Sequence, residues 1–321
     1  MSIKLLSQKT IKKKILENYL DYQYMFVEFQ SKFLSGLHTR YQSVENGNLV
    51  LYYERQTHQA ILRKKDYDLD FNLSYEKFWK NHNEIVPKKK SIIKIATDTS
   101  LPKETARRKI LLLTKLKVLN KKNKNTGWLP NEQYKINYNL LIKTEITNVS
   151  KLIDFVCKKI NIFLPKEEVE KEIKEKFSFY WFHYLGAQLE YLKLWSKQFN
   201  DLELVFIFLQ VAHLFSAKAK KKNLSHYEIH NESSALKEFI SASISATSVS
   251  EVTGIPRATC VRKLEILVKL NVIEQDNNSR RYYFIPSGLA DNLVSQKITK
   301  KVVKIFSNFF FICIRAINAR T

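Results

Sequence analysis

The chain has 321 residues, 45% hydrophobic and 12% aromatic, which suits two globular domains that each bury a core of their own. Its formal net charge of +23 favours a polyanionic partner, although lysine is abundant along the whole chain. Cys157, Cys260 and Cys313 are too widely spaced for a disulfide framework or a metal site. No apolar run reaches the roughly 18 residues of a membrane span, and lysines interrupt the first residues where a secretory signal would lie, so we expect a cytoplasmic protein.

The first half of the chain opens with an aromatic amphipathic stretch at 21–34, which predicts a helix. Residues 100–116 read SLPKETARRKILLLTKL, in which a proline precedes apolar residues at helical spacing. Residues 121–138 are polar and contain a second short β-like run. An apolar run at 150–163 predicts a closing helix for this half.

The second half begins with a charged run at 165–177, which predicts a solvated helix that joins the halves, and an aromatic run at 177–199, which predicts a core helix. Residues 248–254, SVSEVTG, predict a short helix that ends at a glycine able to adopt positive φ. The next predicted helix, 257–270, has its apolar residues on one face. The run VIEQDNNSRRYYFI then predicts two strands around a polar turn, and 300–314 predicts an apolar closing helix.

Two parts of the chain repeat one another. At an offset of 154, eight of the 17 aligned pairs between 102–118 and 256–272 are identical. Upstream, an offset of 155 aligns 48–58 with 203–213. We therefore expect a duplicated unit of helices, a helix-turn-helix, a hairpin and a closing helix, which is the element order of a winged helix-turn-helix behind a helical subdomain.

The segment GIPRATCVRKLEILVKLNVI resembles the turn and recognition helix of bacterial winged helix-turn-helix regulators of the MarR-like and IclR-like groups. LPKETARRK is similar to bacterial helix-turn-helix proteins with a Pro-x-Glu-Thr-x-Arg-Arg core. The first copy departs from the pattern in two ways. Ser100 stands where the second copy has Gly254, and Trp128 and Pro130 predict a wing longer than a tight hairpin.

The expected fold class is mainly α, an internal duplication of a helical subdomain followed by a winged helix-turn-helix. The first repeat, 1–163, would hold a helical part at 1–85, the winged helix-turn-helix at 86–138 and a closing helix at 150–163. The second repeat, 164–321, would hold the matching parts at 164–232, 234–286 and 297–316.

The resemblance implies that each recognition helix enters the major groove of double-stranded DNA with its first residues at base edges, while the wing contacts the backbone or the minor groove. In the first copy the residues implied are Lys103, Glu104, Thr105, Arg107, Arg108, Lys109, Lys121, Lys122 and Lys124. In the second copy they are Arg257, Ala258, Thr259, Val261, Arg262, Lys263, Arg280 and Arg281.

Charge is distributed unequally between the two copies. Six of the eleven arginines fall in 100–125 and 254–286, and arginine is the side chain that forks to guanine or phosphate. Residues 87–125 carry a net charge of +11, whereas residues 246–286 carry +2. We expect the first copy to supply most of the non-specific grip on DNA.

The remaining features favour ordinary structural roles. His58 and His213, paired by the repeat, have no further ligands at metal spacing, and Cys260 lies on the buried face of its helix. The apolar run 300–314 is expected in the core or at a homodimer contact. No catalytic constellation and no cofactor site is predicted, so the protein is not expected to be an enzyme, and the sequence does not identify a small-molecule effector.

The function expected from these patterns is a sequence-specific transcriptional regulator that reads a two-part site with two units on one chain. The alternatives are a plasmid or phage replication initiator with tandem winged helices and an architectural DNA-binding protein without sequence preference.

Overall fold

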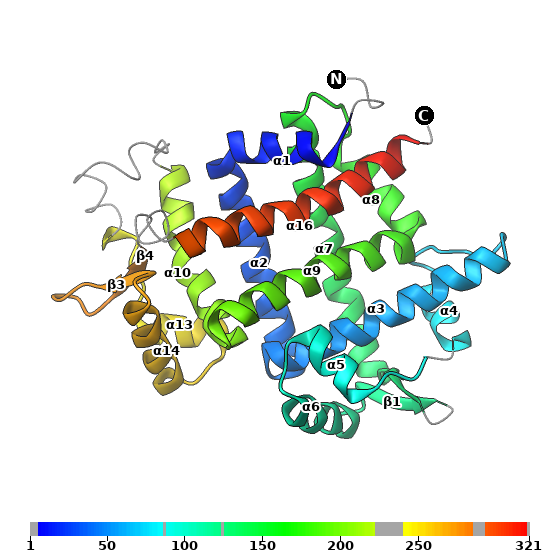
Figure 1. Cartoon of the computed structure of the whole chain (residues 1–321), viewed down its shortest axis with the longest axis horizontal. Helices are drawn as coiled ribbons and strands as arrows, with labels where there is room; N and C mark the ends of the chain where they lie inside the picture. The colour runs from blue at the N-terminus through cyan, green and yellow to red at the C-terminus, as the bar shows by residue number, and fades with distance from the viewer. Residues whose placement is uncertain (1–5, 86–87, 123–124, 222–239, 285–292, 320–321) are drawn as a thin grey trace.

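The computed structural model describes residues 6–85, 88–122, 125–221, 240–284 and 293–319 (Figure 1). Within these ranges the chain forms thirteen helices and two sheets of two strands each, so the expected mainly α fold is confirmed. The expected bounds of the helical and winged helix-turn-helix parts at 86, 232, 234 and 286 lie outside the described ranges.

The first half has seven helices and one strand pair. Their bounds are α1 Gln8–Glu17, α2 Tyr19–Tyr41, α3 Val44–Tyr67, α4 Phe78–Glu84, α5 Ile92–Thr99, α6 Lys103–Lys115, β1 Leu119–Lys122, β2 Asn125–Trp128 and α7 Glu132–Lys159. The helix starts are set locally: the side chains of Ser43, Ser91 and Asn131 each accept a hydrogen bond from a backbone N–H of the first turn of α3, α5 and α7.

The described part of the second half follows the same order without a counterpart of α4. Its elements are α8 Lys166–Glu175, α9 Phe177–Phe199, α10 Leu202–Lys221, α13 Ala246–Thr253, α14 Arg257–Lys269, β3 Ile273–Gln275, β4 Tyr282–Phe284 and α16 Leu293–Asn318. Both strand pairs are antiparallel, with Leu119 opposite Trp128 in one and Ile273 opposite Phe284 in the other.

Matching elements of the two halves begin at constant offsets. The helices α1, α2 and α3 begin 158 residues before α8, α9 and α10, whereas α5 and α6 begin 154 residues before α13 and α14. The upstream alignment at 155 is therefore wrong by three residues, which is close to one helical turn and so preserves the apolar pattern. His58 and His213 do not occupy matching places: His58 is fully buried, while His213 is half-buried.

The wing of the first copy is shorter than expected, because helix α7 begins at Glu132. The strands pair from Leu119 opposite Trp128 to Lys122 opposite Asn125, and the helix begins at Glu132. Residues 132–138 are therefore helical and not part of a longer wing. The helix expected over 150–163 is the C-terminal part of α7, which ends at Lys159. The cause is local, because the Asn131 side chain accepts from Tyr134 N and starts the helix, while buried Trp128 anchors the hairpin beneath it.

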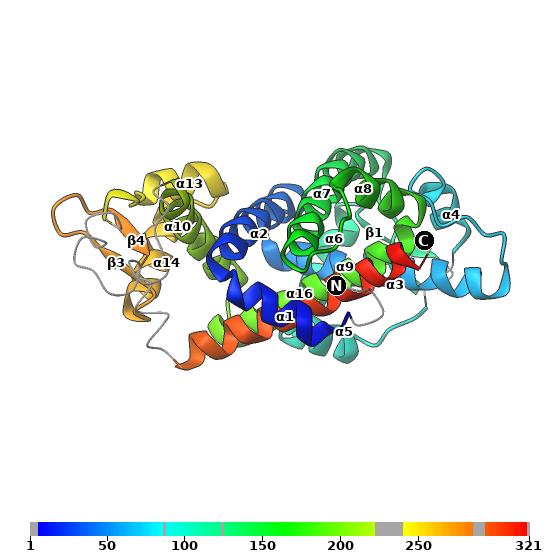
Figure 2. The ribbon, with the colours of Figure 1, turned by 90° about the horizontal axis from the view of Figure 1, so that it is seen from above.

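The two halves exchange their packing partners. Helix α1 packs on α16 of the other half, and α8 packs on α7; α2 packs on α10, and α9 packs on α3. In Figure 2, α7 and α8 lie along one long side of the molecule, and α1 and α16 lie along the other. The buried side chains form one continuous core from Leu6 to Ile317, so the expectation of two separate cores is wrong.

Two amphipathic helices are covered within the chain. The charged run of α8 is solvated on one face only, since Val169 and Ile173 are fully buried. In α16, Phe306 and Phe310 are buried where α1, α7 and α9 pack against the helix, so this face is not free for a homodimer contact.

The described residues contain no single helix that is long and apolar enough to cross a membrane; α9 and part of α10 pass the length and composition test only as a pair bent by 99°.

The core of the first half contains buried ionisable groups. Tyr138 donates a hydrogen bond of 2.5 Å to Glu54 Oε1, and Arg40 Nη2 lies 3.6 Å from Glu145 Oε1. Burial raises the pKa of Glu54 to about 8 and that of Glu145 to about 7, the latter against the opposing charge of Arg40. Burial also lowers the pKa of His58 to about 3. The folded state therefore favours a protonated Glu54 and a neutral His58.

Candidate nucleic-acid interface

Helix α6 follows α5 after a sharp turn at Ser100, which adopts the left-handed conformation at φ 55°. Ser100 thus takes the conformation that Gly254 takes at φ 73° in the second half, without the freedom of a glycine. Ala106 and Leu113 are fully buried and fix one face of α6 on the body. The opposite face is thereby presented to solvent.

The solvent face of α6 holds most of the residues expected to contact DNA. Lys103, Glu104, Arg107 and Arg108 are exposed, and Thr105 is half-buried. Arg107 Nε lies 3.5 Å from Glu104 Oε2, with each side chain 66% exposed. Such an exposed pair is weak, on the order of 0–1 kcal/mol, so Arg107 remains available to an incoming acceptor.

The matching face of α14 holds the second set. Arg257, Ala258 and Arg262 are exposed, while Thr259 and Val261 are half-buried. The expected burial of Cys260 is confirmed, and burial raises the pKa of its thiol. Arg257 Nε donates to Thr247 Oγ1 at 3.1 Å, which ties the start of α14 to the start of α13.

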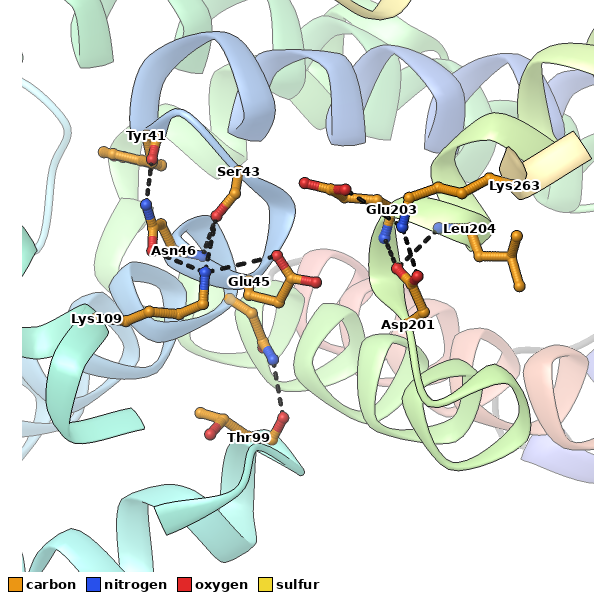
Figure 3. Close-up of polar contacts among 11 residues, drawn as sticks. Tyr41, Ser43, Glu45, Asn46, Thr99, Lys109, Asp201, Glu203, Leu204 and Lys263 are labelled. Carbon is orange, nitrogen blue, oxygen red and sulfur yellow. Dashed lines mark hydrogen bonds and ion pairs between the residues drawn. The ribbon is translucent and has the colours of Figure 1, made fainter. Parts of the chain in front are cut away.

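Lys109 does not point outward with its neighbours. Its ammonium lies 3.3 Å from Ser43 Oγ, 3.3 Å from Asn46 Oδ1 and 3.7 Å from Glu45 Oε2, at the start of α3 (Figure 3). Contrary to the expected outward position of Lys109, its ammonium group contacts the helical body.

Lys263 in α14 also points inward, although the sequence placed it on the outer face of the helix. It is 6% exposed, and its Nζ lies 2.5 Å from Asp201 Oδ2 and 3.3 Å from Glu203 Oε2 at the start of α10 (Figure 3). Asp201 also accepts from the backbone N–H groups of Glu203 and Leu204. A helix N-terminus repels a cation, so these carboxylates are needed to hold the lysine there.

The hairpins carry the remaining expected contacts. Lys121 is exposed on β1; the side chain of Lys122 and all of Lys124 lie outside the described residues. Arg280 and Arg281 are exposed at the end of the second hairpin, but Arg281 also donates to Ser243 O at 2.8 Å. Of the two, Arg280 is the freer to reach a phosphate.

The two exposed helix faces belong to neighbouring units. Both α5–α6 and α13–α14 lie in the lower half of Figure 1, on either side of the corner between α9 and α10. A cavity of about 350 Å³ separates them, lined by Thr105 and Lys109 on one wall and by Asp201 and Lys263 on the other.

The described residues contain no cluster of three or more His, Cys, Asp or Glu side chains that could hold a metal ion. No protein-family model, curated protein or solved structure matches this chain.

Sequence reasoning missed the role of Lys109 and Lys263. A signal was present, because these lysines are identical in the two copies while Glu104/Ala258 and Arg107/Val261 differ. Their acidic partners Glu45 and Glu203 also correspond, since they are the second residues of α3 and α10. Thr247, the partner of Arg257, lies ten residues earlier in the chain and carried no comparable signal.

Proposed function

We propose that the protein is a sequence-specific DNA-binding regulator of transcription in which two winged helix-turn-helix units, α5–β2 and α13–β4, read one two-part site. The observation that carries the proposal is the repeated presentation of an exposed arginine, Arg108 and Arg262, at matching places on the helix after the turn. The position agrees with that of a recognition helix, whose first turns face the major groove.

An internal duplication is part of this proposal. It is supported by the equal lengths of α1 and α8, ten residues each, and of α2 and α9, 23 residues each. The matching strand pairs, and the matching lysines that dock α6 and α14 on the body, support it further. One chain thus carries what two subunits of a dimeric regulator would each supply.

Charge supports DNA as the partner. The net charge of +11 over 87–125 surrounds α6, and Lys103, Arg107, Arg108 and Lys121 are exposed there. Duplex DNA binds such a surface by release of counterions, independent of sequence. The divergent residues of the two helices then supply sequence discrimination.

Binding-site selection from a random duplex pool tests the proposal. Wild-type protein is expected to enrich a two-part motif, and Arg108→Ala and Arg262→Ala are each expected to lose contrast in one part, by about 1–3 kcal/mol at the base concerned. Arg63→Ala, an exposed arginine on α3, is the matched control and should return the parent motif. Enrichment of no motif would leave non-specific binding, and an unchanged motif in both arginine variants would overturn the assignment of α6 and α14.

Genome-wide mapping of bound DNA then separates the kinds of regulator. Sites upstream of promoters support transcriptional regulation, whereas sites confined to iterated repeats within an origin would support replication initiation.

A further inference from the structure

The packing between the two halves is reciprocal. Helix α1 contacts α16 while its counterpart α8 contacts α7, the counterpart of α16. In the same way α2 contacts α10 while α9 contacts α3. In addition, α3 contacts its own counterpart α10, and α7 contacts its own counterpart α16. Such a pattern belongs to an isologous arrangement about a twofold axis, since a head-to-tail arrangement joins unlike surfaces and brings no element against its own counterpart.

Single residues repeat the exchange at the two turns. Ser196 Oγ in α9 donates to the carbonyl oxygen of Ser100, at the turn of the first unit, at 3.4 Å. Gly254, at the turn of the second unit, faces His38 of α2, where a Cβ added to the glycine would lie 3.8 Å from His38 Cε1. Ser196 follows His38 by 158 residues, the offset of their helices. Each turn is thus seated on the helix of the other half.

The approximate twofold axis that relates the two halves also relates the exposed faces of α6 and α14. Lys109 and Lys263 fix the rotation of α6 and α14 about their own axes, because each lysine reaches the first turn of an earlier helix of its own half. Lys109 reaches Glu45 in α3, and Lys263 reaches Glu203 in α10. With matching inner faces docked at matching corners, the outer faces at Arg108 and Arg262 are also related by the approximate twofold axis.

We infer that the DNA site of this protein is an imperfect inverted repeat, read by one chain, and not a direct repeat. The inference rests on the proposed function. A twofold relation between two recognition helices matches the local twofold axis of B-DNA, so the symmetry of the protein is mirrored in the bound sequence. Two direct repeats would instead require units related by translation along the duplex, which the reciprocal packing excludes for a body held by a single core.

Differences between the exposed residues of α6 and α14 predict at which positions the two half-sites differ. Arg108 and Arg262 are identical and exposed, so they contact the same base in both half-sites. Glu104 and Arg107 are replaced by Ala258 and Val261 in the second copy. Glutamate accepts from cytosine N4 and arginine forks to guanine, whereas alanine and valine offer only apolar contact, for example to a thymine methyl group. The half-sites differ at those positions.

Synthetic duplexes test the inferred orientation. The two half-sites, as returned by selection, are placed in inverted or in direct order over a series of spacings, and binding of the full chain is measured at one salt concentration. The best inverted duplex is expected to bind at least about 10²-fold more tightly than any direct one, because only there do both units engage and add their affinities through a high effective concentration. Equal affinity for direct and inverted duplexes would overturn the inference while leaving the proposed function intact; failure to bind any duplex would overturn the proposed function itself.

A reader-exchange variant tests the asymmetry. Glu104→Ala with Arg107→Val gives α6 the reading residues of α14, and both positions are exposed, so folding is expected to be unaffected. This variant should prefer the perfect inverted repeat of the second half-site over the wild-type sequence, by about 10-fold or more for the contacts exchanged. The Arg63→Ala control keeps the wild-type preference, and a reader-exchange variant that also keeps it would contradict the reading roles of these two positions.

Discussion

Arg262 and Lys263 are neighbours of equal charge in opposite environments. Arg262 is exposed, whereas Lys263 is 6% exposed and paired with Asp201 and Glu203. We expect Lys263→Met to lower the free energy of unfolding by about 1–3 kcal/mol, because it leaves two half-buried carboxylates without their cation. Arg262→Ala should change it by less than about 0.5 kcal/mol but weaken DNA discrimination.

Denaturant unfolding of both variants measures this difference. Lys269→Met, an exposed lysine on the same helix, is the control and should unfold like the wild type. If Lys263→Met kept full stability and lost DNA affinity, the lysine would be a DNA contact after all.

The buried carboxyl groups predict a pH dependence of stability. The pKa of Glu54 is raised to about 8 in the folded chain, against about 4.3 for an ordinary glutamate, so the folded state binds the extra proton between these values. The resulting stability is fully present below pH 4.3 and is lost as the pH rises towards 8. His58, whose pKa is lowered to about 3, has the opposite effect, and its stability is present above about pH 6.5 and is lost as the pH falls.

Between pH 6.5 and 8, therefore, the titration of Glu54 changes the free energy of unfolding and that of His58 does not. The free energy of unfolding of the wild type should fall across this window, with a slope of at most about 1.4 kcal/mol per pH unit for each proton lost. Glu54→Gln cannot titrate and should make the fall smaller. A slope unchanged by this substitution would show that Glu54 is ionised in the folded chain.

At the scale of elements, the turns before α6 and α14 predict opposite effects of two substitutions on stability. Ser100 and Gly254 both have positive φ, which costs a residue with a Cβ about 1–2 kcal/mol. Ser100→Gly should therefore raise the free energy of unfolding by about 0.5–1 kcal/mol, and Gly254→Ala should lower it by about 1 kcal/mol. Thermal unfolding of the two variants checks both signs, and stabilisation by Gly254→Ala would contradict the described turn.

Sequence patterns predicted some elements better than others. The helices α13 and α14, the glycine between them and the strands β3 and β4 were all predicted, because a glycine, a proline and a polar turn mark their ends. The start of α7 was missed because the capping role of Asn131 was overlooked in a polar segment. The upstream alignment slipped by three residues because an apolar helix looks nearly the same after one turn.

The prediction of the site was limited for a different reason. Helical periodicity predicts which positions of α6 and α14 face outward, and Arg108 and Arg262 are exposed as predicted. Lys109 and Lys263 lie at the edge of that face, and their inward turn depends on carboxylates about 60 residues away in the chain. A lysine at the edge of a helix face can turn inward or outward, depending on where its acidic partners lie. The local sequence pattern does not show where those partners are.

At the scale of the whole molecule, the exchanged packing predicts that neither half folds alone. Fragments 1–163 and 164–321 would each expose the helix faces that the other half covers, since α1 needs α16 and α3 needs α9. We expect each fragment to lack a cooperative unfolding transition, and the two together to form a complex that unfolds like the intact chain. Cooperative folding of one isolated fragment, followed by circular dichroism, would contradict the shared core.

The shared core also bears on how the spacing of half-sites is set. If the two units read one site as proposed, the link between α7 and α8 does not set the spacing, because the units are held by the packing of α2, α3, α9 and α10. Inserting a few flexible residues beside Pro165 should leave the preferred half-site spacing unchanged. A broadened range of tolerated spacings in the insertion variant would show that the halves are joined by the link alone.

In the proposed function, one chain brings two readers to one duplex. Hydroxyl-radical footprinting of the selected site, with the mass of the same complex measured by light scattering, tests it most directly. The account predicts one chain per duplex and two protected segments in inverted orientation, one of which weakens in Arg108→Ala and the other in Arg262→Ala. Two chains per duplex, or a single protected segment that responds to only one of these substitutions, would contradict it.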